Sequence, residues 1–215
     1  MTLPSLQQIE RQSLCELMLD YGPTAPTLCG DWNTTDLVIH LYVRERKPLA
    51  APGILLGGPF ASVLHRTTER LSQLPFPELV EAVRKGPPAP LRPFDRVVNL
   101  LEYYIHHEDV RRGAGDNSPR VAAETERLDD ALWNLLGRIG RLLTRSSRPI
   151  GLRMIWTDEA REREHVVRPG QPWATLAGRP GELALYLTGR KTAAQVELSG
   201  SAAAMEALRT APFGI

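Results

Sequence analysis

Cysteine is scarce in this chain, with only Cys15 and Cys29 among 215 residues. Two thiols cannot build the multi-disulfide framework of a small secreted domain, and such scarcity is typical of a reducing compartment. Charge of one sign is also lacking, because the formal net charge is +1 and basic residues are interspersed with acidic ones. This balance argues against the basic surface that nucleic-acid-binding proteins need.

Long apolar runs are absent as well. No stretch approaches the roughly 20 apolar residues of a membrane-spanning helix, and the first residues lack the basic and apolar regions of a secretory signal peptide. We therefore predict a cytoplasmic protein that does not bind membranes. The apolar fraction of 42% and the charged fraction of 24% are typical of a globular protein, with one large domain or two small ones.

Helical periodicity dominates the first part of the chain. Asn33 followed by Asp36 has the form of a capping box at a helix start, and Gly22 and Pro48 are helix-ending signals. Apolar residues at helical spacing predict helices over 6–21, 34–47, 61–73, 75–85, 94–112 and 124–145.

The periodicity changes after Pro149. Strand-like patterns cover 151–157, 165–167 and 194–198, and helical patterns cover 181–189 and 201–208. We predict a mainly α protein in two domains, with an all-helical bundle over 1–149 and a small α/β module over 150–215.

The predicted helix over 94–112 carries several side chains that can bind a metal ion or transfer a proton, in the segment E-Y-Y-I-H-H-E-D. Glu102 and His106 stand four residues apart, which places them on one helix face with their Cβ atoms about 5–6 Å apart. They border the apolar stripe of that helix, and a carboxylate and an imidazole that face an interior need a partner. A metal ion would be such a partner, and an arginine is the alternative.

A third ligand must come from another helix, and His40 is the natural choice. It lies in the well-signalled helix over 34–47, although a lone histidine on such a face is more often a hydrogen-bonded core residue. His107 points about 100° away from His106 around the helix, so we place it outside the ligand set.

Two acidic residues follow the histidines. Glu108 and Asp109 can orient ligand histidines through the second ring nitrogen, or they can form salt bridges with Arg111 or Arg112. Cys29 precedes a helix start, where a thiol pKa can be lowered, but a small loop residue is the simpler interpretation.

Three segments together resemble a known family. They are T-L-C-G-D-W-N-T-T-D-L-V-I-H-L-Y-V-R-E-R, E-Y-Y-I-H-H-E-D-V-R-R and P-G-E-L-A-L-Y-L-T-G-R. They resemble the mycothiol-dependent maleylpyruvate isomerase-like proteins, a branch of the DinB-like metal-binding proteins, and most closely the short actinobacterial-type members called metal-binding proteins. The resemblance covers nearly the whole chain. It implies a DinB-like four-helix bundle that holds a divalent metal, usually zinc, through His40, Glu102 and His106.

The same resemblance implies a chemistry. In the enzymes of this family the open metal position receives the thiolate of mycothiol, which adds to an electrophile and gives isomerisation or thiol transfer. Arg44, one turn beyond His40, is a candidate to bind a carboxylate of the thiol or substrate, and a structural pair with the neighbours of Glu102 is the alternative. Arg190, in L-T-G-R, is a second candidate for cofactor binding, from the C-terminal module. A non-catalytic metal- or ligand-binding or sensing module remains a second hypothesis. We expect a monomer or a homodimer.

Overall fold

The structure is a computed structural model that describes residues 4–51, 53–54, 60–89, 92–118, 120, 122–147, 150–157 and 162–213, with backbone alone for 92–98 and 122–124. Within these residues the chain is mainly helical, as the sequence predicts, and carries a small four-stranded sheet near its C-terminal end, where the sequence predicts three strands. No helix among them has the length and apolar character needed to cross a membrane.

The contacts divide the chain into two compact units, Met1–Asn117 and Ser118–Ile215. Helix α7 (Ala122–Leu143) therefore belongs to the second unit, together with the sheet. The sequence groups this helix with the preceding ones and places a domain boundary near Pro149, which itself lies outside the described residues. That boundary, and the four-helix bundle that depends on it, stay predictions.

The first unit consists of helices at the predicted positions. They are α1 (Leu6–Tyr21), α2 (Thr34–Arg46), α4 (Ala61–Leu71), α5 (Phe76–Arg84) and α6 (Arg92–Gly113). Helix α1 ends at Gly22, whose φ of +81° favours glycine. Helix α2 begins with the predicted capping box, in which the side chain of Asn33 accepts from the backbone N–H of Asp36 at 3.0 Å.

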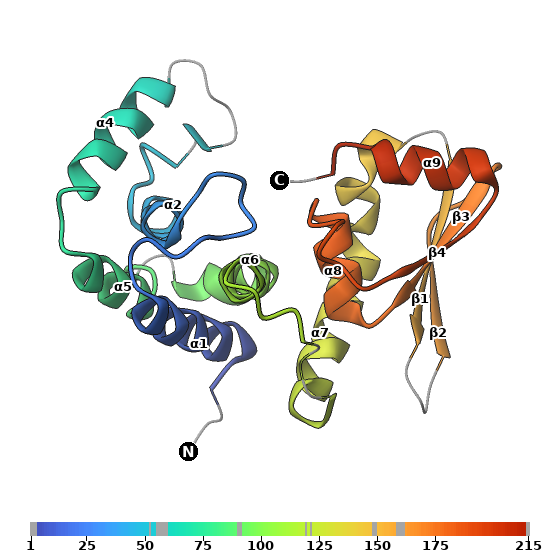
Figure 1. Cartoon of the computed structure of the whole chain (residues 1–215), viewed down its shortest axis with the longest axis horizontal. Helices are drawn as coiled ribbons and strands as arrows, with labels where there is room; N and C mark the ends of the chain where they lie inside the picture. Colours follow the sequence, from blue (N-terminus) through green and yellow to red (C-terminus); the bar gives the residue numbers. More distant parts are fainter. Residues whose placement is uncertain are drawn as a thin grey trace. The chain divides into compact units, whose positions relative to one another are not determined.

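Helix α2 lies in the middle of this unit, with the other helices around it (Figure 1). It packs on α4 and α5, and α1 packs on α5 and α6. The helices share one apolar core, whose fully buried members include Leu14, Met18, Leu37, Leu41, Leu79, Val80, Val83, Tyr103 and Val110. This core holds the polar residues at the border of α2 and α6 in fixed positions.

The loop before α2 is fastened to the C-terminal part of α6. The backbone N–H of Leu28 donates to the carbonyl of Asp109 at 3.0 Å. Gly113 approaches the loop so closely that an added Cβ would lie 2.5 Å from the Cα of Thr27. The hydroxyl of Thr27 in turn donates to the carbonyl of Trp32 at 2.8 Å and accepts from the backbone N–H of Cys29 at 3.1 Å. These contacts fix the position of Cys29 beside α6.

The second unit combines helices with one sheet. After α7 come the 3-10 turn η3 (Arg145–Ser147), β1 (Gly151–Thr157), β2 (Glu162–Arg168), β3 (Trp173–Gly178), α8 (Pro180–Leu187), β4 (Glu197–Gly200) and α9 (Ala202–Thr210). The strand order is β2-β1-β3-β4, in which β1 runs antiparallel to β2 and parallel to β3, and β4 runs antiparallel to β3. The sequence does not predict β3, because W-A-T-L-A-G is largely buried inside the sheet and shows no alternation.

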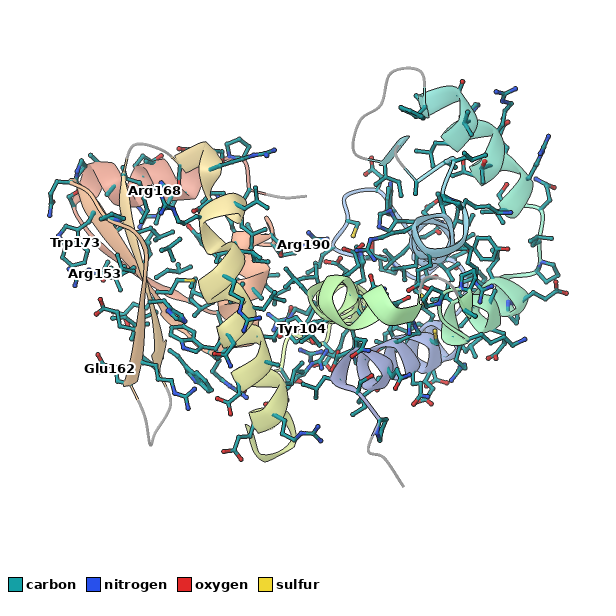
Figure 2. The ribbon with its side chains drawn as sticks, turned by 180° about the vertical axis from the view of Figure 1, so that it is seen from behind. Tyr104, Arg153, Glu162, Arg168, Trp173 and Arg190 are labelled. Atoms are coloured by element: carbon teal, nitrogen blue, oxygen red, sulfur yellow. The ribbon has the colours of Figure 1, made fainter. Side chains whose placement is uncertain are left out.

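Helices α7 and α8 lie on one side of this sheet (Figure 1). Arg168 of β2 connects the two layers, since its guanidinium donates to the carbonyls of Thr144 at 2.6 Å and Ile150 at 3.0 Å. Arg153 and Trp173 lie on the sheet face that points away from α7, with the guanidinium 4.5 Å from the ring centroid (Figure 2). The sheet therefore has one apolar face and one mixed face.

Candidate metal centre

Two helices of the first unit bring His40, Glu102 and His106 together. The Oε1 atom of Glu102 lies 3.2 Å from the Nε2 atom of His40 and 3.2 Å from the Nε2 atom of His106. One possible ligand atom from each residue can be chosen so that all three lie within 4.8 Å of one another. The structure thus places the three residues that the sequence predicts as ligands in one cluster. Their role as metal ligands stays a prediction.

The donor set and its two nitrogen–oxygen distances suit a divalent ion such as zinc. Zinc binds imidazole nitrogen at about 2.0–2.1 Å and carboxylate oxygen at about 2.0–2.2 Å, so tetrahedral ligand atoms stand about 3.3–3.4 Å apart. The two nitrogen–oxygen distances of 3.2 Å are close to that value. Three protein ligands would leave one position for a small molecule, as in catalytic zinc sites.

The protonation of the cluster is set by its own hydrogen bonds. Burial alone would raise the pKa of Glu102, but hydrogen bonds with His106 and His40 and the charge of Arg44 hold that pKa well below its usual value. Burial would lower the pKa of His106, but hydrogen bonds with Asp109, Cys29 and Glu102 raise it well above its usual value. Without a metal, these hydrogen bonds therefore favour the protonated form of His106.

The second ring nitrogen of His106 faces a different pair of side chains. Its Nδ1 atom lies 2.8 Å from Oδ2 of Asp109, a carboxylate with no exposed surface. The thiol of Cys29 donates to the same oxygen at 3.0 Å and lies 3.9 Å from Nδ1. Asp109 thus orients His106 through the nitrogen that does not face Glu102, which is one of the two roles that the sequence leaves open for it.

Arg44 lies at the edge of the cluster. Its Nε atom is 3.2 Å from Oε1 of Glu102, and its guanidinium also donates to the side-chain carbonyl of Asn99. The structural alternative predicted for Arg44 is a pair with the neighbours of Glu102, whereas the ion pair in the structure is with Glu102 itself. The contact of Arg44 with a thiol or substrate stays a prediction.

The buried carboxylate of Glu45, the residue after Arg44, joins helices α1, α2 and α6. The Oε1 atom of Glu45 accepts from Arg11 of α1 at 2.6 Å, from Tyr103 of α6 at 2.7 Å and from Asn99 of α6 at 3.3 Å. Because Glu45 follows Arg44 in α2, this network fixes α2 against α6. It therefore helps to set the separation of His40 from Glu102.

His107 and Glu108 of α6 have partners outside the cluster. His107 pairs with Glu10 of α1, with Nδ1 3.0 Å from Oε2, so it lies outside the cluster as predicted. Glu108 forms salt bridges with Arg111 at 2.7 Å and Arg112 at 2.6 Å, which is the structural role that the sequence allows for it.

Arg190, the other candidate for thiol or substrate binding, belongs to the second unit and lies just after α8 (Figure 2). Its guanidinium donates to the carbonyl of Thr188 at 2.7 Å. The predicted role of Arg190 stays a prediction.

Sequence reasoning underestimated Cys29 and did not single out Trp32. Cys29 is 77 residues from His106 in the chain, and only the fastened loop brings its sulfur beside the imidazole. The ring of Trp32 packs against that of His40, with centroids 5.4 Å apart, while 41% of its surface stays exposed. In the sequence, the motif G-D-W before the capping box is the one feature that could have drawn attention to Trp32.

Comparisons of the chain with protein-family models, with curated proteins and with solved structures found no match.

Proposed function

We propose that the first unit binds one divalent metal ion, most favourably zinc, through His40, Glu102 and His106. The observation that supports this most directly is the position of Oε1 of Glu102, 3.2 Å from the Nε2 atoms of both histidines. Two imidazoles and one carboxylate are a common donor set of catalytic zinc sites. Asp109 at Nδ1 supplies the supporting hydrogen bond that metal-binding histidines regularly make.

We further propose that the metal-loaded protein is a thiol transferase or isomerase that acts on a small electrophile. A bound zinc ion would supply a thiolate at neutral pH by lowering the pKa of a coordinating thiol. In this proposal Arg44 binds a carboxylate of the thiol or substrate, and the exposed part of Trp32 forms an apolar wall beside His40. The resemblance to the maleylpyruvate isomerase-like proteins makes mycothiol the thiol to test and supports a DinB-like bundle as the metal-binding domain.

Metal content tests the first proposal. The purified protein, dialysed and subjected to elemental analysis, should hold about one zinc ion per chain. A variant with His40→Ala, Glu102→Gln and His106→Ala should hold none, while the His107→Ala control keeps the ion because His107 pairs with Glu10. Unchanged metal in a folded triple variant would refute the site.

A non-catalytic binding or sensing module is the alternative, and one observation favours it. Arg44 lies 3.2 Å from the same carboxylate oxygen that would bind the metal, so Glu102 also has a partner when no ion is bound and the ion could bind and leave reversibly. Zinc-loaded protein incubated with mycothiol and a panel of electrophiles separates the two functions. Turnover that is lost in Glu102→Gln supports the enzyme, whereas metal binding without turnover supports the binding module.

A further inference from the structure

His106 stands between two different sets of donor atoms. Its Nε2 atom faces Glu102 and His40, with Glu102 Oε1 at 3.2 Å. Its Nδ1 atom faces Asp109 at 2.8 Å and Cys29 at 3.9 Å. Cys29, His106 and Asp109 also offer one ligand atom each within 4.8 Å of one another.

The two donor sets differ in softness and charge. The first set offers two nitrogens and one oxygen, and Arg44 places a positive charge 3.2 Å from that oxygen. The second set offers a sulfur, an oxygen and a nitrogen, and carries two negative charges once the thiol of Cys29 has lost its proton. Thiolate ligands select soft cations, while imidazole and carboxylate suit borderline and harder ones.

The second set is held in place by the fold. Asp109 has no exposed surface and only 7% of His106 is exposed. Cys29 follows the segment that is fastened to α6 through the hydrogen bond from the Leu28 N–H to the carbonyl of Asp109 at 3.0 Å. The sulfur, carboxylate and imidazole therefore lie together without a rearrangement of the loop.

We propose that Cys29, Asp109 and Nδ1 of His106 form a second subsite, selective for a thiophilic cation such as Cd²⁺, that competes with the His40–Glu102–His106 site. On binding, the thiol proton of Cys29 and the proton on Nδ1 of His106 both leave to solvent, so that the sulfur binds as a thiolate and Nδ1 binds through its lone pair. Competition follows from the shared ring, because a neutral imidazole has only one nitrogen with a free lone pair. The competition rests on the proposed metal site, whereas the subsite itself does not.

Cadmium titration tests the subsite. One equivalent of Cd²⁺ added to the metal-free protein should produce the ultraviolet sulfur-to-cadmium charge-transfer absorbance. The Cys29→Ser variant should lose that absorbance, whereas Cys15→Ser should keep it, since the thiol of Cys15 is buried and directed at the carbonyl of Val80. A folded wild-type protein without the absorbance at saturating Cd²⁺, or with the same absorbance in Cys29→Ser, would overturn the subsite.

A second variant separates this proposal from the first metal site. In the double variant His40→Ala, Glu102→Gln the first site is disabled, but the cadmium–sulfur absorbance should persist with an affinity within about tenfold of wild type, the low end of effects seen for residues outside a ligand set. If wild-type protein binds no Co²⁺ or Zn²⁺ while the cadmium absorbance is present, the proposed function fails and the subsite stands. Loss of the absorbance in the folded double variant would overturn the subsite.

Sharing of His106 has its own readout. Protein loaded with one equivalent of Co²⁺ should show a visible spectrum that fades as the cadmium–sulfur absorbance grows, with the total metal remaining near one ion per chain. Persistence of the full Co²⁺ spectrum beside a saturated cadmium absorbance, with two ions per chain, would overturn the competition.

Discussion

Glu102 on α6 reaches His40 on α2, with Oε1 of the carboxylate 3.2 Å from Nε2 of the imidazole. The two residues are 62 positions apart, and this contact closes the cluster to which His106 belongs. The chemistry of the cluster therefore depends on the charge of Glu102.

Replacing Glu102 with Gln should cause a large loss of metal affinity. Glutamine keeps the shape and a weak oxygen ligand but removes a negative charge beside the cation, so the loss should exceed the roughly 10–100-fold effect typical of residues outside the ligand set. His107→Ala should cost far less, because His107 contacts Glu10. Competitive chelator titrations of both variants measure the two losses. Equal losses would mean that the wrong helix face has been assigned.

Metal affinity should fall as pH drops, starting above the usual histidine range. Burial opposes the charge of His106, but hydrogen bonds with Asp109, Cys29 and Glu102 raise its pKa well above the usual 6.5, so a metal competes with a proton at higher pH than at an ordinary histidine. Below that raised pKa the apparent affinity should weaken about tenfold per pH unit for each proton displaced. Above it, the contribution of His106 to the pH dependence should vanish.

The Asp109→Asn variant isolates this effect. Without the carboxylate at Nδ1 the pKa of His106 should fall, and the pH at which affinity levels off should fall with it. Chelator competition at closely spaced pH values measures both curves. Superimposable curves for wild type and Asp109→Asn would contradict the assignment of the proton to His106.

Removing the charge of Arg44 should strengthen metal binding. Its Nε atom lies 3.2 Å from the ligand oxygen of Glu102, so it competes with a cation for that oxygen and repels the ion. Arg44→Gln should therefore raise affinity several-fold, while Arg66→Gln, which removes an exposed positive charge on α4, should leave it unchanged. A loss of affinity in Arg44→Gln would show that Arg44 mainly positions Glu102. If the protein is an enzyme, Arg44→Gln should also raise KM for a carboxylate-bearing thiol.

The sequence predicts the pairing of Glu102 with His106 on one helix face, and most of the helices, because these signals are local. The capping box of Asn33 and Asp36 marks the start of α2, and the four-residue spacing of Glu102 and His106 fixes their common helix face. The end of α1 at Gly22 follows from the positive φ that glycine adopts readily. Each of these features depends on residues within about one helical turn.

The features that the sequence misses depend on long-range packing. The thiol of Cys29 contacts Asp109 only because Gly113 allows the loop to approach α6 closely. No local sequence pattern predicts that approach. The sequence does not predict strand β3 because its burial does not alternate along the chain, whereas β1, which also lies between two strands, alternates in part. Helix α7 looks like a bundle member from its apolar face, whereas its packing on α8 and β2 is set by the tertiary structure.

Gly113→Ala should destabilise the first unit and disturb the second cation subsite. An added Cβ would lie 2.5 Å from the Cα of Thr27 and 2.6 Å from the carbonyl oxygen of Pro26, and neither backbone atom can move independently. The free energy of unfolding should fall by about 1–3 kcal/mol, as for other overpacked sites. Urea unfolding measures it, and exposed Asp20→Ala should change it by less than about 0.5 kcal/mol. Wild-type stability in Gly113→Ala would contradict the close approach of the loop.

The last prediction concerns the buried carboxylate of Glu45. Its Oε1 atom accepts from Arg11 and Tyr103, so Glu45→Leu leaves the guanidinium of Arg11 buried without this partner. Breaking a buried ion pair from one side typically costs about 3–5 kcal/mol, and urea unfolding should show a loss of that size.

The double variant Arg11→Met, Glu45→Leu separates stability from positioning. Replacing both charges with apolar side chains is often close to neutral, so most of the lost stability should return. Metal affinity should stay about tenfold below wild type, because Asn99, which accepts from Arg44, loses its own acceptor and the spacing of α2 and α6 is no longer fixed. Chelator titration of the refolded double variant measures this. Full recovery of both stability and affinity would show that the network stabilises the helices without positioning His40 against Glu102.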